Sequence, residues 1–548
     1  MSRNVTMLSK RLGIKSGLFE QQKQLDTNPI AKEQLADKSL TGTSVIESSR
    51  TFYDFMTGDS ADKRAYVCNG TACECAGKQA ELKTRLQSEL GDDDVAEMTC
   101  LGHCYAGGAF MLDGQTYDIE DLDDALSEVK SEQALIPEGH ATTTPILLNP
   151  CSDISNWYAP ILAAISNQTT NELLDELIAA NLRGRGGAGF PAGIKWRGCR
   201  DYDADEKYIV CNADEGDPGA FSDRYLLERH PHSVIYGMLL AGAISGAREG
   251  IIYLRLEYPK AIEVCRKAID ELQEAGILST SLNAQGYRFD LHLIVGAGAY
   301  ICGEETALLR SIEGQRPVVS VRPPFPVESG LFGQPTIVNN VETFACCPWI
   351  ISQGGAAFQA AGTEQSAGHK LICLDHTFNK PGLYEVAMGT PLAEVVNELG
   401  GGFKLAVKAL HIGGPLGGVV PVEKVHDLRV SFESFAEHGF LLGHGSIVGI
   451  PDSVPMLNYI EDLFQFTAHE SCGKCFPCRL GATRGYEMMQ QAKRGHVIDP
   501  ELLTDLLDTM EHGSLCALGG GVPLPIRNIL TYFPDEVFKQ VGLEVKHV

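Results

Sequence analysis

The chain has 548 residues, a formal net charge of −26, 44% apolar residues, 21% charged residues and 17 cysteines. This length suffices for three or four folded units of ordinary globular composition. The acidic balance argues against nucleic acid as a partner, because phosphate-backbone binding relies on clustered lysine and arginine. No segment approaches 18 consecutive apolar residues, so we predict no direct membrane insertion.

The N-terminal residues include basic side chains but no continuous apolar segment and no small-residue cleavage site. Because an export signal needs both features, we expect a cytoplasmic protein. In that compartment, numerous cysteines favour metal ligation over disulfides. The spacing of the cysteines must then indicate which of them act as ligands.

The N-terminal part of the chain divides into three predicted segments. Residues 1–63 are polar with helix-compatible stretches, so we expect a helical leader that docks elsewhere. Residues 64–132 alternate strand-like and helical patterns, which predicts a small α/β unit. A Thr/Pro-rich stretch indicates a linker over 133–164.

Three more segments follow the linker. Residues 165–368 alternate Gly-rich loops, buried strands and helices, as in an α/β nucleotide-binding domain. Short strands broken by glycines predict a compact β-rich module over 369–436. Helical periodicity predicts a helical domain over 437–548.

The segment HESCGKCFPCR places Cys472, Cys475 and Cys478 as Cys-x2-Cys-x2-Cys, and Cys516 follows in a glycine-rich turn. Three thiolates on one tight loop can hold one face of a cubane cluster, and a distant fourth thiolate completes it. Zinc is the alternative, but zinc modules favour paired CxxC units over a compact triplet. We therefore predict a [4Fe–4S] cluster.

A second set consists of Cys68 and Cys73, separated by four residues, and Cys100 and Cys104, separated by three. Each pair lies in a Gly-rich loop after a strand-like segment, and four thiolates in two pairs suit a [2Fe–2S] centre. A zinc-bound or redox-inert unit of the same shape is the alternative. Cys75 lies nearby but outside the paired spacing, so we exclude it as a ligand.

The glycine-rich segment 183–190, RGRGGAGF, contains a formal GxGxxG pattern. A helical segment precedes it, whereas a dinucleotide-binding fingerprint requires a strand there. The missing side chains would still let backbone approach a flat ring or a phosphate, and Lys195 offers positive charge. A purely structural turn is the alternative.

Two further loops lie after predicted strands, where α/β sheets bind ligands. The first, 211–221, is densely polar. The second leads into a helix that begins near Glu304 and Glu305. These carboxylates suit the hydroxyls of a ribityl chain or a ribose, or they are only helix-start carboxylates favoured by the helix dipole.

Together these motifs closely resemble the NADH-binding flavoprotein subunit of respiratory complex I and its soluble relatives in NAD-linked formate dehydrogenases and NAD-reducing hydrogenases. The resemblance covers residues 150–535, while 64–132 resembles the family's thioredoxin-like [2Fe–2S] subunit, fused in front. The implied fold is a multidomain α/β protein. It has a thioredoxin-like N-terminal domain, an α/β FMN/NADH-binding domain, a ubiquitin-like β-grasp (SLBB-type) module and a C-terminal helical bundle with the [4Fe–4S] cluster.

The resemblance also implies residue roles. FMN would be held by Gly184, Arg185, Gly186, Lys195, Asn212, Asp214, Gly303, Glu304, Asn339, Asn340 and Thr343. NAD(H) would stack on the flavin, contacted by Phe190, Asp217, Glu305 and Phe325. Two positions depart from the complex I form: Asp217 replaces a glutamate, and Gly198 replaces an adenine-stacking aromatic.

The implied activity is hydride exchange between NAD(H) and FMN, with single electrons passing through the iron–sulfur centres, and it requires no catalytic side chain. The phrases NADEGDPGAF and GFLLGHGSIV resemble the soluble relatives, which favours a formate-oxidising catalytic subunit as partner. A hydrogenase or complex I are the alternatives, and a small thioredoxin-like [2Fe–2S] subunit is a further expected partner. No formate site, molybdopterin-binding domain or nickel-ligand pattern is recognisable, so the second substrate must bind another chain.

Overall fold

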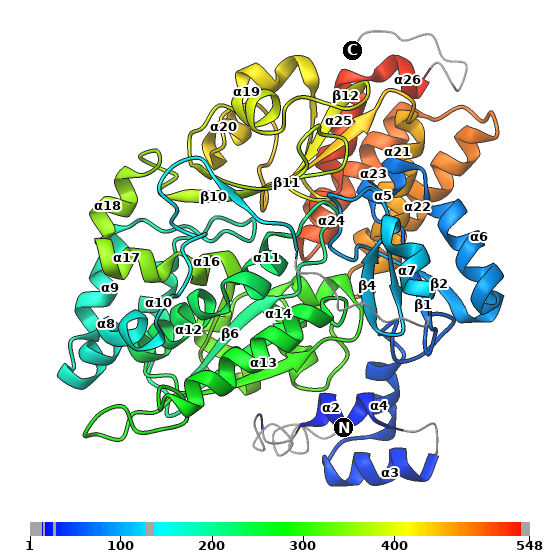
Figure 1. Cartoon of the computed structure of the whole chain (residues 1–548). Helices are drawn as coiled ribbons and strands as arrows, with labels where there is room; N and C mark the ends of the chain where they lie inside the picture. The colour runs from blue at the N-terminus through cyan, green and yellow to red at the C-terminus, as the bar shows by residue number, and fades with distance from the viewer. Residues whose placement is uncertain (1–13, 15–16, 26–28, 128–135, 539–548) are drawn as a thin grey trace.

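The computed structural model of the chain describes residue 14 and residues 17–25, 29–127 and 136–538. Three sheets organise it, with helices between them (Figure 1). Within the described residues, no helix is both long and apolar enough to cross a membrane. The chain is a mixed α/β multidomain protein, as expected from the alternation of strand and helix patterns.

A four-stranded parallel sheet in the order β8-β7-β6-β9 forms the centre of the largest unit. Its strands are apolar because helices cover both faces of a parallel sheet. The strands are β6 (Tyr208–Ala213), β7 (Glu249–Leu254), β8 (Asp290–Val295) and β9 (Thr336–Asn340).

Helices α12 and α13 contribute to the main hydrophobic core on one face of this sheet. The helices of this unit are α9 (Thr170–Ala179), α10 (Ala192–Asp201), α11 (Ser222–Arg229), α12 (Pro231–Ser245), α13 (Pro259–Glu274), η4 (Tyr300–Gly303), α14 (Glu305–Ile312), α15 (Pro326–Ser329), η5 (Leu331–Gly333), α16 (Val341–Ala345), α17 (Cys347–Gln353) and α18 (Gly355–Ala360).

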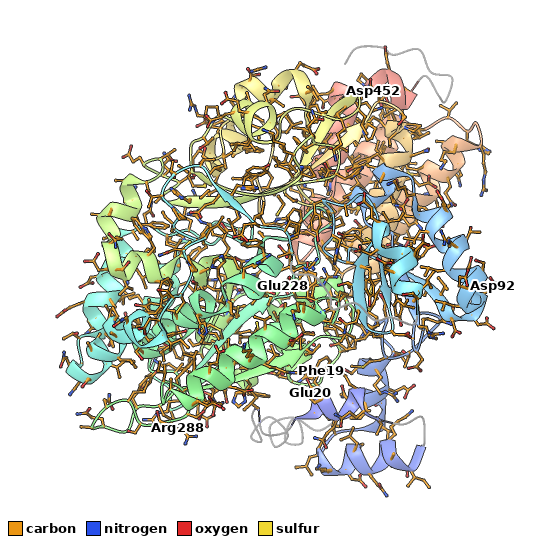
Figure 2. All side chains as sticks on the ribbon, in the orientation of Figure 1. Phe19, Glu20, Asp92, Glu228, Arg288 and Asp452 are labelled. Atoms are coloured by element: carbon orange, nitrogen blue, oxygen red, sulfur yellow. The ribbon has the colours of Figure 1, made fainter. Side chains whose placement is uncertain are left out.

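In the described part of the predicted leader, the first helix docks on the other face of the parallel sheet. The two following helices pack with it in a small cluster of their own. Phe19 packs against Tyr53 and Tyr253, with ring centroids 5.4 and 6.4 Å away. Gln22 Nε2 donates to the carbonyl of Gly314 at 2.8 Å. Figure 2 labels Phe19 where the N-terminal helices, drawn in pale blue-violet, meet the α/β unit. The helices are α2 (Leu18–Lys23), α3 (Pro29–Lys38) and α4 (Thr43–Arg50).

The N-terminal α/β unit is built on a mixed sheet in the order β2-β1-β3-β4, in which β1 is parallel to β2 and antiparallel to β3. Its α/β character follows the predicted alternation, while its thioredoxin-like identity stays a prediction. The elements are β1 (Ala65–Cys68), α5 (Thr71–Ala76), α6 (Gln79–Leu90), η2 (Asp92–Asp94), β2 (Val95–Met98), β3 (Ala109–Leu112), β4 (Gln115–Asp118), η3 (Ile119–Asp121) and α7 (Leu122–Leu126).

Buried ionic contacts hold this unit against the parallel-sheet unit. Arg224 pairs with Glu228 at 2.7 Å and donates to the carbonyl of Gly102 at 3.0 Å. Arg255 donates to the carbonyl of Cys100 at 2.8 Å. Glu228 lies in the interior of the molecule, whereas labelled Asp92 lies at its rim (Figure 2). The loop that contains Cys100 and Cys104 is therefore anchored by both units.

The third sheet has six strands in the order β13-β12-β14-β10-β11-β5. The ubiquitin-like identity of this β-rich module stays a prediction. The elements are β5 (His140–Ala141), β10 (His369–Leu374), β11 (Gly382–Ala387), α19 (Leu392–Glu394), η6 (Val395–Leu399), β12 (Val407–Ile412), β13 (Gly418–Pro421), η7 (Val422–Asp427), α20 (Phe432–Glu437) and β14 (Ser446–Pro451).

Two predicted boundaries differ from the observed elements. The expected linker 133–164 contains β5, which pairs with β11, and most of α8 (Ile154–Asn167); residues 133–135 lie outside the described residues. Asp153 caps α8, and Tyr158, Ile161 and Ile165 bury one side of it, so its periodicity outweighs the nearby Thr/Pro-rich stretch. Strand β14 lies in the segment expected to be helical, because its apolar run is short and bounded by glycine and proline.

The C-terminal helices share a hydrophobic core with Ala409, Val419 and Ile450 of the six-stranded sheet. They lie beside the pale-blue N-terminal α/β unit, in orange and red (Figure 1). The helices are α21 (Met456–Glu470), α22 (Phe476–Lys493), α23 (Pro500–Gly513), α24 (Ala517–Gly521), α25 (Pro523–Tyr532) and α26 (Pro534–Phe538).

Candidate functional site

A cavity of about 460 Å³ lies where the parallel strands end, between the parallel-sheet unit, the six-stranded sheet and the C-terminal helices. Loops from all three parts of the molecule contribute to its wall. Seven of the predicted cofactor residues line it: Gly186, Asn212, Asp214, Asp217, Gly303, Glu304 and Asn340.

Strand register explains why residues so distant in sequence meet here. Strands β6 and β9 pair in parallel with Asn212 opposite Asn340, so both side chains reach the same sheet edge. Asn212 Nδ2 donates to the carbonyl of Gly303 at 2.7 Å. A Cβ added at Gly186 would lie 2.9 Å from Cβ of Asn340, so this glycine permits a close backbone approach.

The Asp214 carboxyl group is a strong indication of a missing ligand. Its Oδ2 is buried and has no hydrogen-bond partner within the described part of the chain. Burial raises the pKa of Asp214 well above its ordinary value, which favours the neutral form of the carboxyl group. An unpaired buried polar atom costs free energy unless a ligand completes its hydrogen bonding, and a flavin edge offers both donors and acceptors.

The two adjacent glutamates have different roles in the structure. Glu304 caps α14, accepting from the backbone N–H groups of Thr306 and Ala307 at 2.9 and 3.0 Å, while it also lines the cavity. The Oε2 atom of Glu304 therefore acts as a helix cap, which is the alternative role that the sequence allowed for this carboxylate. Glu305 pairs with Arg322 at 2.7 Å.

The remaining predicted FMN residues form a layer behind the cavity wall. Arg185 is 1% exposed, its backbone N–H donates to Thr343 Oγ1 at 2.9 Å, and its guanidinium group donates to the carbonyl of Ala367. Lys195 Nζ donates to the carbonyl of Val338 at 3.0 Å, and burial lowers the pKa of this lysine. The arginine charge therefore lies in the core.

Two more residues of this layer shape the wall through backbone and side-chain contacts. Gly184 donates its N–H to the carbonyl of Phe190 at 2.9 Å, which closes the glycine-rich loop on itself. Asn339 Oδ1 accepts from Trp196 Nε1 at 2.9 Å. The loop follows helix α9, as expected, and not a strand.

Of the predicted NAD(H) residues, Asp217 lies in the cavity wall and the aromatic residues lie outside it. Phe190 and Phe325 are 52% and 50% exposed, an unusual exposure for large apolar side chains. A Cβ added at Gly198 would contact nothing within 4 Å, so the missing aromatic leaves open space.

The first cysteine set borders this cavity. Cys472, Cys478 and Leu518 belong to one buried cluster, with Cys475 and Cys516 packed against it. Cys516 and Leu518 also line the cavity, so cavity and cysteines share a wall. A four-thiolate zinc site holds its sulfurs about 3.8 Å apart. Across the described residues, no three cysteine sulfurs lie within 4.8 Å of one another.

The second cysteine set forms two pairs. Cys100 and Cys104 have sulfurs 3.7 Å apart. A hydrogen bond from Cys73 lowers the pKa of the Cys68 thiol to about 7, which places these two side by side. Cys75 packs against the main hydrophobic core, which includes Cys100 and Cys104, and against the core of the C-terminal helices. Its exclusion from the ligand set stays a prediction.

Sequence reasoning missed several residues of the cavity wall. His444 pairs with Asp217, and Tyr300 donates its hydroxyl to the same carboxylate at 2.5 Å. Leu416, from the loop between β12 and β13, also lines the cavity. The glycines around Leu416 and His444 were the available signal, but their spacing does not indicate what they face.

Fold and site define the class: a protein that combines a flavin-binding α/β unit with an iron–sulfur region. Residues 177–349 match the family model described as the Nuo51 FMN-binding domain. Residues 458–540 match the NADH-ubiquinone oxidoreductase-F iron–sulfur binding region. The chain belongs to the family of complex I 51-kDa flavoprotein subunits and their hydrogenase counterparts.

Several relatives support this membership. The mitochondrial NADH dehydrogenase (ubiquinone) flavoprotein 1 of Dictyostelium discoideum is 37% identical over 401 residues, covering 71% of this chain and 83% of the relative. The NADP-reducing hydrogenase protein HndC of Solidesulfovibrio fructosivorans is 43% identical over 379 residues, covering 68% and 77%. The HoxS alpha subunit of the NAD-reducing hydrogenase of Cupriavidus necator is 33% identical over 540 residues, covering 91% and 87%.

The fold extends the similarity to nearly the whole chain. A crystal structure of an NAD⁺-reducing [NiFe]-hydrogenase in the H₂-reduced state superposes with a TM-score of 0.84 at 28% identity. The match covers 96% of this chain and 94% of that chain. The N-terminal units are therefore included in the shared architecture.

Proposed function

We propose that this chain exchanges hydride between NAD(H) and FMN in the cavity and passes single electrons to or from a partner subunit. The observation that carries this proposal is that the predicted cluster and the cavity share a wall. Cys516 belongs to the predicted [4Fe–4S] set and lines the same cavity as Asn212 and Asp214. A flavin there would lie next to the cluster, which favours fast electron transfer.

The wall residues fit FMN. Asn212, Asp214, Gly303 and Glu304 would contact the isoalloxazine ring and ribityl chain, while Asn340 lies at the end proposed for the phosphate, with Asn339 and Thr343 behind it. When bound, FMN accepts a hydride from NADH and releases electrons one at a time. The protein groups only position and tune the cofactor, so no general acid or base is required.

NAD(H) would approach from the open side of the glycine-rich loop. The exposed rings of Phe190 and Phe325 are available to flank an adenine. Glu305 and Asp217 supply carboxylates for ribose and nicotinamide contacts. The Glu305–Arg322 pair must open or rearrange for Glu305 to bind a ribose hydroxyl.

We propose a [2Fe–2S] centre at Cys68, Cys73, Cys100 and Cys104. The arrangement in two sulfur pairs supports this assignment, because each iron of such a centre takes two thiolates. Cys68 ends β1 and Cys73 lies in α5, while Cys100 and Cys104 lie in the loop after β2. All four side chains are buried. The centre is either a relay or a side branch of the electron path.

The partner that we favour is a formate-oxidising catalytic subunit, accompanied by a small thioredoxin-like [2Fe–2S] subunit. The phrases around Asp217 and His444 support a soluble complex. A hydrogenase is the second candidate because relatives and the superposed structure are hydrogenase subunits. Co-purification under native conditions would separate a formate-oxidising partner from a nickel hydrogenase or complex I subunits.

The proposed function is tested by anaerobic titration of the FMN-loaded chain with NADH. We expect the flavin absorbance to bleach and an electron paramagnetic resonance signal of reduced iron–sulfur centres to appear. Flavin that stays oxidised in excess NADH would refute the proposal. Zinc in place of iron and acid-labile sulfide would refute the cluster assignments.

A further inference from the structure

His444 lies in the loop before β14 and pairs with Asp217, which lies in the loop after β6. The distance from His444 Nε2 to Asp217 Oδ2 is 2.8 Å, with the side chains 11% and 24% exposed. Both residues line the cavity. The pair therefore joins the six-stranded sheet to the parallel-sheet unit at the proposed cofactor site.

Packing fixes the geometry of this pair. Tyr300 donates to Asp217 Oδ1 at 2.5 Å, so both carboxylate oxygens are engaged. A Cβ added at Gly414 would lie 2.7 Å from Cγ of Asp217, and one at Gly216 would lie 2.7 Å from the Tyr300 ring. Close backbone contact from two loops thus leaves the carboxylate little freedom to turn away.

Among the described residues of the cavity wall, His444 alone has a side chain that can carry a positive charge. The wall contains five acidic residues: Asp214, Glu215, Asp217, Asp223 and Glu304. Lys195 and Arg185 lie behind the wall and donate to backbone carbonyl groups. Any negative charge that a ligand gains in the cavity therefore meets one candidate cation.

The surroundings of His444 favour its protonated form. Burial lowers its pKa, but the charge and hydrogen bond of Asp217, together with the charge of Glu215, raise the pKa above the ordinary value. Lys370 opposes this shift, yet it is itself paired with Glu342. His411, which also faces Asp217, is neutral because burial lowers its pKa to about 4.

We propose that His444, anchored by Asp217, is a positioning residue that stabilises the two-electron-reduced state of the cofactor in this cavity. The inference rests on the proposed function. Hydride transfer oxidises NADH to NAD⁺ and adds one net negative charge to the cavity ligand, while His444 exchanges no atom. The imidazolium group lowers the free energy of the reduced state because opposite charges attract in a poorly solvated site.

The test is a spectroelectrochemical titration of flavin in the full FMN-loaded chain, with mediators and without NADH. For His444→Gln we expect the equilibrium preference for reduced flavin to fall about tenfold, a midpoint potential about 30 mV lower for a two-electron couple. His444→Lys restores the charge and should recover most of the shift. His438→Gln is the matched control, because His438 is exposed and its Nδ1 contacts only a backbone carbonyl.

A pH series gives a second readout that a purely structural role would not change. In the wild type, the potential should fall more steeply with pH once pH exceeds the His444 pKa of the oxidised protein. This extra slope should vanish in His444→Gln. If that variant fails to retain flavin, the wild-type pH series and His444→Lys still decide.

Distinct results would overturn the two ideas. A wild-type chain that binds no FMN would overturn the proposed function, and this inference with it. Flavin that NADH bleaches normally, with an equal potential in wild type and His444→Gln, would overturn the inference alone. A wild-type potential without the extra pH slope would also count against it.

Discussion

The backbone N–H of Gly219 donates to the sulfur of Cys104 at 3.2 Å. Gly219 belongs to the loop between β6 and α11, which also contributes Asp214 and Asp217 to the cavity wall. One short loop thus contacts both the proposed flavin site and a ligand of the proposed [2Fe–2S] centre. This contact leads to the first prediction.

Gly219→Ala should alter the [2Fe–2S] centre. Gly219 has φ +98°, and an added Cβ would lie 2.7 Å from Val448 Cγ2, so the loop must shift and lengthen the N–H···S contact. Because hydrogen bonds to sulfur help to set cluster potentials, we expect a lower [2Fe–2S] potential and a changed resonance signal. Gly91→Ala is the control, with φ +102° but nothing within 4 Å; equal effects in both variants would contradict the prediction.

Cys516→Ser should separate flavin reduction from electron transfer. We expect loss of the [4Fe–4S] signal and of the corresponding iron and sulfide, while NADH still bleaches the flavin, because Cys516 contributes only one edge of the cavity wall. Electron transfer to the natural partner should fall to background. Cys151→Ser is the control and should retain all signals, because Cys151 lies outside both cysteine sets. An unchanged iron content in Cys516→Ser would exclude Cys516 as a ligand.

Asp214 should act on FMN as a neutral group. Since burial raises the pKa of its carboxyl group and so favours the protonated form, Asp214→Asn should retain FMN affinity close to that of the wild type. Asp214→Ala removes a buried hydrogen-bonding group and should weaken binding by about 1–3 kcal/mol. Quenching of FMN fluorescence measures both affinities, and equally large losses in the two variants would show that Asp214 binds as a carboxylate.

The ion pair Lys370–Glu342 is buried, with side chains 0% and 1% exposed. Lys370→Met should leave an unpaired buried carboxylate and destabilise the protein by about 3–5 kcal/mol. Lys83→Met removes one partner of an exposed pair and should cost less than about 1 kcal/mol. Thermal unfolding of the full chain measures the loss of stability in both variants. Similar losses of stability would mean that Glu342 binds another partner or a proton.

His230 should make the folded state sensitive to acid. Burial lowers its pKa from 6.5 to about 4, so between these values the unfolded chain binds a proton that the folded chain does not. Its contribution to stability is therefore lost as pH falls from about 6.5 to 4, by up to about 3 kcal/mol. His230→Phe should flatten the dependence of the melting temperature on pH over this range; an unchanged dependence would assign the acid sensitivity to other groups.

Much of the candidate site could be predicted from the spacing of residues along the chain. The triplet Cys472, Cys475 and Cys478 falls within seven residues, so a single loop and helix start bring these thiols together whatever the rest of the chain does. The polar loop 211–221 follows a buried strand, and a strand end in a parallel sheet is a binding edge by geometry. Helix α8 was missed because its apolar periodicity begins within a stretch dominated by turn-forming residues.

By itself, the sequence indicated which cysteines are candidate metal ligands, where glycines allow backbone to approach a ligand, and where strands alternate with helices. Only the tertiary structure decided that Cys516 shares a cavity wall with Asn212, that the Arg185 guanidinium group lies in the core, and that His444 pairs with Asp217. The physical reason is the separation along the chain of the residues that make contact. Spacing along the chain constrains neighbours within a turn or a strand, whereas contacts between residues more than 200 positions apart depend on how whole units pack.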